Sequence, residues 1–142
     1  MTTHTNYVTQ TMTTQARHYA SPAQQVGPDA STWLTRGANF VVAVSQADAG
    51  SVLSRDNHPD EFMVYLVDAT AVIEAGGQRI EAKADSLSIV PPGASRITLT
   101  AAGQVLRVFS TRATDLANAA GNSAVYAAGA PDVAPLKDWP DP

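Results

Sequence analysis

Short β-rich runs separated by turn signals recur through the middle of the chain, and this pattern limits the possible folds more than any other feature. Gly76-Gly77 separates two runs as a tight hairpin does, and Pro91-Pro92-Gly93 forces a corner. Because no amphipathic helix intervenes, the pattern predicts an antiparallel barrel or sandwich. The runs lie at residues 62–67, 70–74, 79–81, 86–90, 96–100 and 104–110.

The composition on either side of this region changes and divides the chain into three segments. Residues 1–30 are rich in Thr, Gln and Ser without a sustained hydrophobic period, which predicts a flexible N-terminal arm. Strand-like runs begin at Ser31, so we assign residues 31–112 to the β-barrel. Residues 113–142 are rich in Ala and then Pro, which predicts one short helix followed by an extended strap or linker.

Composition excludes several classes of function. The 142 residues suit one domain, and the chain has no cysteine, so any metal must be held by His and carboxylates. The net charge is −4 and the basic residues are scattered, which argues against a nucleic-acid partner. The apolar runs are far shorter than the ~20 residues of a membrane-spanning helix. With no secretory signal pattern in residues 1–20, we expect a cytoplasmic protein.

Two segments resemble the signature motifs of the cupin superfamily. The first family motif is Gly, five residues, His-any-His, three or four residues, Glu, six residues and Gly. The second is Gly, five residues, Pro-any-Gly, two residues, His, three residues and Asn. Residues 50–68 follow the first with Gly50, His58 and Glu61 kept, but Asp56 stands at the first His, Asp68 at the last Gly, and only two residues precede Glu61. Residues 85–100 follow the second with Pro91-Pro92-Gly93 kept, but Asp85, Arg96 and Thr100 stand at its Gly, His and Asn positions.

The resemblance implies an all-β fold. The expected architecture is a cupin-like double-stranded β-helix, or jelly-roll, barrel of two facing antiparallel sheets. It implies an interior pocket between the sheets that receives a small-molecule ligand. It also implies a homodimer, because members of the family frequently dimerise through the barrel.

The motif positions suggest one way of holding a metal. In the family, the two His and the Glu of the first motif and the His of the second hold the ion. Strand alternation sends Asp56 and His58 to one face, and the turn after His58 returns Glu61 beside them. The set Asp56, His58 and Glu61 would suit a divalent metal such as Fe, Mn, Ni or Zn. Arg96 holds the last His position and offers only donors, so it cannot ligate.

A different use of the same residues follows from charge. Arg96 beside Asp56 or Glu61 would form an ion pair where a metal would sit, and it could instead grip an anionic ligand. In that arrangement Arg96, His58, Tyr65 and Asp56 line the ligand pocket. The bland interpretation is that Asp56 to Glu61 is only a polar turn and that Tyr65 is core or barrel lining.

Three functions therefore stay open. The first is binding of a small anionic molecule without a full set of metal ligands. The second is a divalent-metal enzyme of the oxygenase, isomerase or lyase type. The third is a structural or dimerisation module, whose pocket would be filled by side chains such as Met63, Tyr65 and Phe109. The direction of Arg96, into the barrel or out of it, separates the first two.

Overall fold

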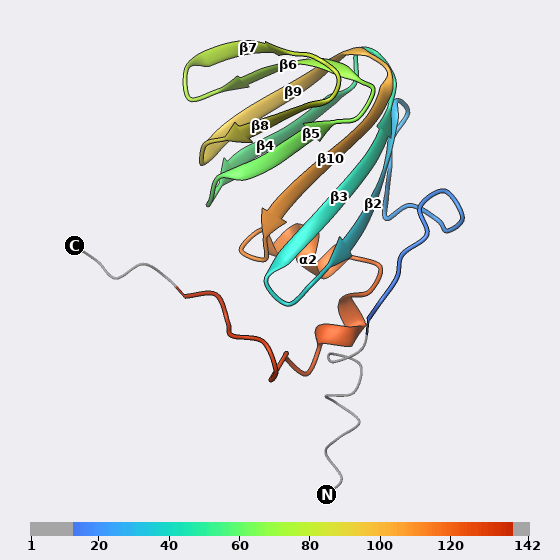
Figure 1. Cartoon of the computed structure of the whole chain (residues 1–142), viewed down its shortest axis with the longest axis vertical. Helices are drawn as coiled ribbons and strands as arrows, with labels where there is room; N and C mark the ends of the chain where they lie inside the picture. The colour runs from blue at the N-terminus through green and yellow to red at the C-terminus, as the bar shows by residue number, and fades with distance from the viewer. Residues whose placement is uncertain (1–12, 138–142) are drawn as a thin grey trace, which may run out of the picture.

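The computed structural model describes residues 13–137, which form two antiparallel β-sheets packed face to face (Figure 1). The larger sheet has the strand order β1-β2-β3-β10-β5-β8, and the smaller has the order β4-β9-β6-β7. The predicted all-β barrel architecture is therefore confirmed. Residues 1–12 of the predicted arm and 138–142 of the predicted strap lie outside the described residues. The strands are β1 Gln25–Val26, β2 Ala30–Arg36, β3 Phe40–Ala47, β4 Val52–His58, β5 Phe62–Leu66, β6 Thr70–Ala75, β7 Gln78–Ala82, β8 Ser86–Val90, β9 Gly93–Ala101 and β10 Gly103–Ser110; α2 spans Thr114–Ala119 and the 3-10 helix η1 spans Ser123–Tyr126.

The hairpin expected at the glycine pair joins β6 to β7. Ile73 pairs with Ile80 in antiparallel register, and the turn between the strands contains Gly76 and Gly77. Both glycines have positive φ, +57° and +76°. A two-residue turn whose twist matches the flanking strands needs positive φ at both positions, which glycine adopts without steric cost.

The core lies between the two sheets. Successive side chains on a strand point to opposite faces, so every second residue is buried. On β10 the buried apolar positions include Val105 and Phe109, and on β9 they include Ile97 and Leu99. Burial of each such side chain stabilises the fold by roughly 1.5–3 kcal/mol relative to leaving it in water.

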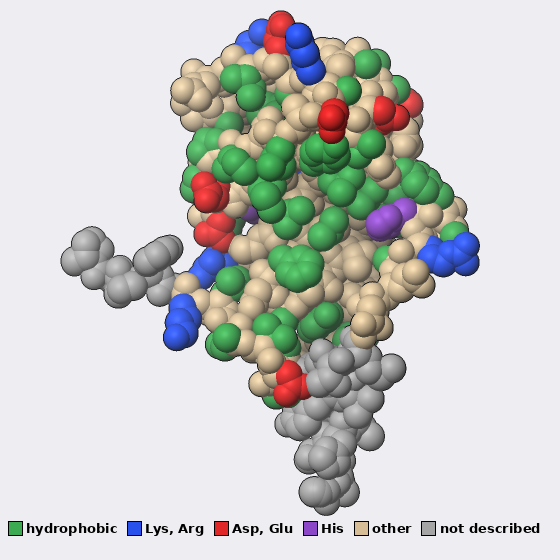
Figure 2. Space-filling view, in the orientation of Figure 1, with side chains coloured by type: hydrophobic (Ala, Val, Ile, Leu, Met, Phe, Trp, Pro, Cys, Tyr) green, Lys and Arg blue, Asp and Glu red, His purple; other side chains and the backbone are tan. Residues whose placement is uncertain are grey.

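The outer face of the larger sheet is also apolar. Two cross-strand rows run from β2 to β8 over this face, and neither row contains a charged residue. Figure 2 shows hydrophobic side chains gathered over this side of the molecule. On β8, Leu87 and Ile89 are 60% and 55% exposed. The rows are Trp33, Val44, Leu106, Tyr65 and Leu87, and Thr35, Val42, Val108, Met63 and Ile89.

The part of β2 that lies beyond its short pairing with β1 is closed by residues from the N-terminal and C-terminal segments. The Leu34 amide donates to Oε1 of Gln24 at 2.7 Å, and the Gly121 amide donates to the Leu34 carbonyl at 2.9 Å. The side-chain amide of Asn122 bonds both the N–H and the carbonyl of Arg36, each at 2.9 Å. These contacts satisfy backbone groups that would otherwise be available to another strand.

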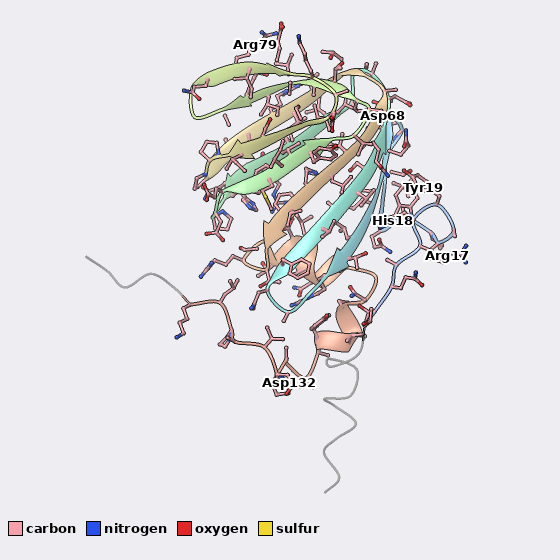
Figure 3. The ribbon with its side chains drawn as sticks, in the orientation of Figure 1. Arg17, His18, Tyr19, Asp68, Arg79 and Asp132 are labelled. Carbon is pink, nitrogen blue, oxygen red and sulfur yellow. The ribbon has the colours of Figure 1, made fainter. Side chains whose placement is uncertain are left out.

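The described part of the arm packs on Trp33 of β2. Tyr19 and His18 lie beside the strand (Figure 3), with ring centroids 4.8 Å and 6.3 Å from the Trp33 ring. The Trp33 indole N–H donates to the Ser21 carbonyl at 2.8 Å. In residues 13–137 no helix has the length and hydrophobicity needed to cross a membrane.

Candidate functional site

An extra residue in β4 decides which of its side chains face the barrel interior. Arg55 pairs with Ser95 of β9, and the next pair is His58 with Gly93, so three steps along β4 match two along β9. This register shift is a β-bulge, which interrupts the alternation of side chains. His58 is therefore buried and Arg55 half-buried, whereas Asp56 is exposed. The prediction that Asp56 and His58 share a face was wrong.

A buried arginine lies on the neighbouring sheet. Arg107 of β10 is only 5% exposed, and its guanidinium lies 5.5 Å from the centre of the Phe109 ring. Among the described residues it has no ion-pair partner, and its Nε has no hydrogen-bond partner. Burial, assisted by the charge of Arg55, lowers the pKa of Arg107 to about 10. The side chain is therefore still a cation near neutral pH.

Arg55 connects the short helix α2 to the barrel. Its two terminal nitrogens donate to both carboxylate oxygens of Asp115 at 2.8 Å and 2.9 Å, and its Nε donates to Nδ1 of His58 at 3.2 Å. The hydrogen bonds from Arg55 lower the pKa of the Asp115 carboxyl. A guanidinium held by two bonds in one plane has a defined orientation. Asp115 thus sets the direction in which Arg55 presents its Nε to His58.

The protonation of His58 follows from the same surroundings. Burial lowers the pKa of His58 below its ordinary value, and the charge of Arg55 lowers it further. The carboxylates of Asp60 and Asp115 act in the opposite direction without reversing the shift. The imidazole is therefore neutral near neutral pH.

Three buried polar atoms in the barrel have no hydrogen-bond partner within the described part of the chain. They are Nε2 of His58, Oγ of Ser95 and Nε of Arg107. The three residues come from β4, β9 and β10, so both sheets contribute to the set. A buried polar group without a partner is costly, and native proteins rarely retain one without a reason.

Two aromatic rings lie beside these polar groups. Phe62 and Phe109 have centroids 4.7 Å apart, and the His58 ring contacts both, at 5.2 Å and 5.1 Å. The same two phenylalanines line a cavity of about 370 Å³ at the ends of β5 and β10. The lining of this cavity also includes Met63, Ile89 and Val108 of the outer face, so it is a hollow at the surface of the larger sheet, and His58, Ser95 and Arg107 do not line it. Residues from Asn39 to Phe40, Glu61 to Met63 and Val108 to Ser110, with Ile89, line that cavity.

Most residues selected from the sequence lie away from this position. Arg96 is exposed on β9, where its strand neighbours are Ser54 and Glu74. Glu61 is exposed at the start of β5. Tyr65 lies on the outer face of the larger sheet, where its hydroxyl donates to Asp85.

Of the ligand-pocket and metal residues proposed from the sequence, the structure places only His58 among the buried interior groups. The side chains of Met63 and Tyr65, expected to fill the pocket of a purely structural barrel, are on the outer face instead. Phe109 does occupy the interior.

The residues present do not fit the metal that the cupin motifs imply. Asp56, His58 and Glu61 do not converge, and residues 13–137 contain no group of three or more His, Asp or Glu that could hold an ion. Nδ1 of His58 already accepts a hydrogen bond from Arg55. A metal ligand needs a free lone pair, and two nearby guanidiniums would repel a cation.

The sequence carried only a partial signal for Arg107, because Leu106 and Val108 make the opposite face of the strand apolar as well. Residues 103–110 alternate so that Arg107 shares one face with Val105 and Phe109, both of which are buried. Arg55 and Ser95 carried no such signal, because their inward direction depends on the register between β4 and β9.

Comparison with known proteins identifies the fold. KdgF from Halomonas sp. is similar over 72% of this chain and 98% of its own, with 15% identity and a TM-score of 0.62. An RmlC-like cupin from Shewanella frigidimarina is similar over 71% and 93%, with 14% identity and a TM-score of 0.60. A salicylate 1,2-dioxygenase from Pseudaminobacter salicylatoxidans is similar over 68% of this chain and 31% of its own, with 12% identity and a TM-score of 0.54.

These likenesses show that the chain has the cupin fold, as its two motifs predict. At identities of 12–15% they show the fold alone. No protein-family model matches the sequence, and no curated protein matches it.

Proposed function

We propose that this cupin-fold protein binds a small anionic molecule inside the barrel, at the end where Arg107, Arg55 and His58 gather. The observation that carries the proposal is the buried guanidinium of Arg107, which among the described residues has no ion pair and no hydrogen-bond partner for its Nε. Removing a charge from water is expensive unless an opposite charge compensates it. Among the described residues, the charge that acts on Arg107 is another cation, Arg55, which supports compensation by a bound anion.

We assign the role of anion-binding arginine to Arg107 and not to Arg96, the residue that the sequence suggested. An exposed arginine is solvated and holds an anion weakly, because water screens the interaction. A buried arginine acts in a medium of low dielectric constant, where the same contact is much stronger. Arg107 is buried and Arg96 is exposed, which supports this assignment.

Thermal unfolding in the presence of simple anions tests the proposal. Sodium acetate, sodium benzoate and inorganic phosphate are compared with the uncharged amides acetamide and benzamide. We expect at least one of the anions to raise the unfolding temperature of the wild type, and the amides to have little effect. The shift is expected to persist in Arg96→Met and to disappear in Arg107→Met.

The two variants are matched, because each removes one arginine from a β-strand in the same way. Equal anion-induced shifts in wild type and Arg107→Met would overturn the proposal. So would the absence of any shift with all three anions in the wild type.

We also propose that the outer face of the larger sheet is where two copies of this chain meet. An antiparallel sheet in a monomer usually turns polar side chains to water on its outer face. Here two rows over five strands are free of charge, although the chain carries a net charge of −4. A second copy presents an equally uncharged face, so no like charges meet across a two-fold contact.

The area of the outer face of the larger sheet also supports a second copy of the chain as the partner. Five strands about 4.8 Å apart and between roughly 17 Å and 27 Å long, for five to eight residues each, project about 500 Å². A stable interface buries on the order of 800 Å² of accessible surface per partner, which a face of this projected size approaches.

Sedimentation velocity of the purified chain over a wide concentration range tests this second proposal. We expect a dimer in the wild type and a monomer in Leu87→Lys/Ile89→Lys. The control Val52→Lys introduces the same charge on an exposed position of the smaller sheet and is expected to remain dimeric. A wild-type monomer at every concentration would overturn the proposal, and so would a dimer that tolerates both lysines.

A further inference from the structure

We infer that the barrel interior holds an oxyanion such as a carboxylate through three donors, and that Arg55 makes His58 one of them by keeping its proton on Nε2. This inference rests on the proposed binding function and specifies its chemistry. The site would thus use the His of the first cupin motif as a hydrogen-bond donor. It would not use that residue as a metal ligand.

Nδ1 of His58 accepts a hydrogen bond from Arg55. Arg55 Nε lies 3.2 Å from this atom and donates to it. A guanidinium has no acceptor atom, so Nδ1 must supply the lone pair and cannot carry the proton. Because the ring is neutral under these conditions, its single N–H is on Nε2.

Asp115 holds Arg55 in place. Asp115 of α2 accepts from both terminal nitrogens of Arg55. Each terminal nitrogen gives one of its two N–H groups to Asp115, which fixes the plane of the guanidinium with its Nε directed at His58. Arg55 is therefore a positioning residue for His58.

The three buried atoms without a partner are all able to act as hydrogen-bond donors. Nε2 of His58 and Nε of Arg107 can only donate in these states, and the Ser95 hydroxyl can donate as well. Their common partner is an acceptor with several lone pairs. A carboxylate offers about four such lone-pair sites, and its negative charge compensates the positive charge of Arg107. A cation or an amine would leave these donors unpaired.

The surroundings of these donors also indicate what the rest of the ligand is like. The rings of Phe62 and Phe109 contact His58 inside the barrel. Apolar surface next to a charged anchor suits a ligand with a compact apolar body. Benzoate is therefore a better probe of the site than acetate.

The experiment measures the tautomer of His58 directly, by long-range proton–nitrogen correlation NMR of ¹⁵N-histidine-labelled full-length protein without ligand, near neutral pH. The chain has three histidines, His4, His18 and His58, and a His58→Asn sample assigns the third. We expect a neutral ring with its proton on Nε2. In Arg55→Met we expect this preference to be lost, whereas the exposed Arg79→Met control retains it.

A second arm titrates sodium benzoate into the same labelled protein. We expect the His58 Nε2–H resonance to move in the wild type and Arg79→Met. Binding is expected to weaken roughly tenfold or more in Arg55→Met, as for loss of a hydrogen bond to a charged group. Benzamide, which has the same shape without the charge, is expected to leave the resonance in place.

The two arms separate two kinds of failure. A proton on Nδ1, or a protonated ring, would overturn the inference about Arg55 even if benzoate binds. The expected tautomer together with no response to benzoate, acetate or phosphate would overturn the proposed binding function and the oxyanion site with it. An Arg55→Met protein that keeps both the tautomer and the affinity would show that Arg55 does not position His58.

Discussion

Arg55 donates its Nε–H to Nδ1 of His58 across the β-bulge of β4. This contact explains why the histidine of the first cupin motif is not available to a metal in the way the motif implies. One ring nitrogen is occupied by the guanidinium, and the other carries the proton. The other ring nitrogen, Nε2, is buried and has no hydrogen-bond partner among the described residues, so it is free to bind a ligand.

Replacing the buried cation should stabilise the ligand-free protein. Met approximates the length of the Arg107 stem without its charge, so Arg107→Met removes an uncompensated buried guanidinium. We expect the free energy of unfolding to rise by about 1–3 kcal/mol. Urea denaturation measures the change, and Arg96→Met is expected to stay within about 0.5 kcal/mol of the wild type. A less stable Arg107→Met protein would contradict the view that the charge is unpaired.

Stability should fall as the solution becomes acidic, because of His58. Its pKa in the folded state is lowered from the ordinary value of 6.5, so the unfolded chain binds a proton at a higher pH than the folded chain does. Stability is thus complete above about pH 6.5 and is lost as the pH falls from there toward the folded pKa.

Urea midpoints between about pH 8 and pH 5 measure this loss. His58→Asn keeps an acceptor for Arg55 and removes the titrating group, so its curve should be flatter over the same interval. Parallel curves for the two proteins would assign the pH dependence to other residues.

Metal removal should leave the protein unchanged. Because Asp56 and Glu61 are exposed and His58 is held by Arg55, we expect no stoichiometric Fe, Mn, Ni or Zn in untagged protein purified without chelator. Elemental analysis measures the content, and treatment with EDTA should not shift the unfolding temperature. Bound metal that disappears in His58→Ala would contradict the assignment of His58 as a donor.

Adding a side chain at Gly93 should lower the stability of the fold, although there is room for one. It pairs with His58 after the bulge and has φ of +104°, while an added Cβ would meet nothing within 4 Å. Gly93→Ala should therefore destabilise the fold by about 1–3 kcal/mol through backbone strain alone. Gly27→Ala is the control, since that position has ordinary van der Waals space and no positive φ. Equal urea midpoints for the two variants would rule out this explanation.

The sequence by itself determined the fold. Turn residues such as Gly76-Gly77 and Pro91-Pro92-Gly93 act locally, through the φ angles they allow, so their positions could be read without knowing the rest of the structure. The resemblance to the two cupin motifs implied the same barrel of two facing sheets. The predicted barrel and the β6–β7 hairpin are both present.

Only the tertiary structure decided which side chains enter the barrel. The bulge that turns His58 inward and Asp56 outward arises from pairing with β9, a strand nearly forty residues away in sequence. On β10 both faces are apolar, because Leu106 and Val108 lie on the outer face of the larger sheet, so hydrophobicity could not tell which face holds Arg107. Register is a relation between strands, and a shift of one residue exchanges the inner and outer faces. The site depends on that relation, which no single strand encodes.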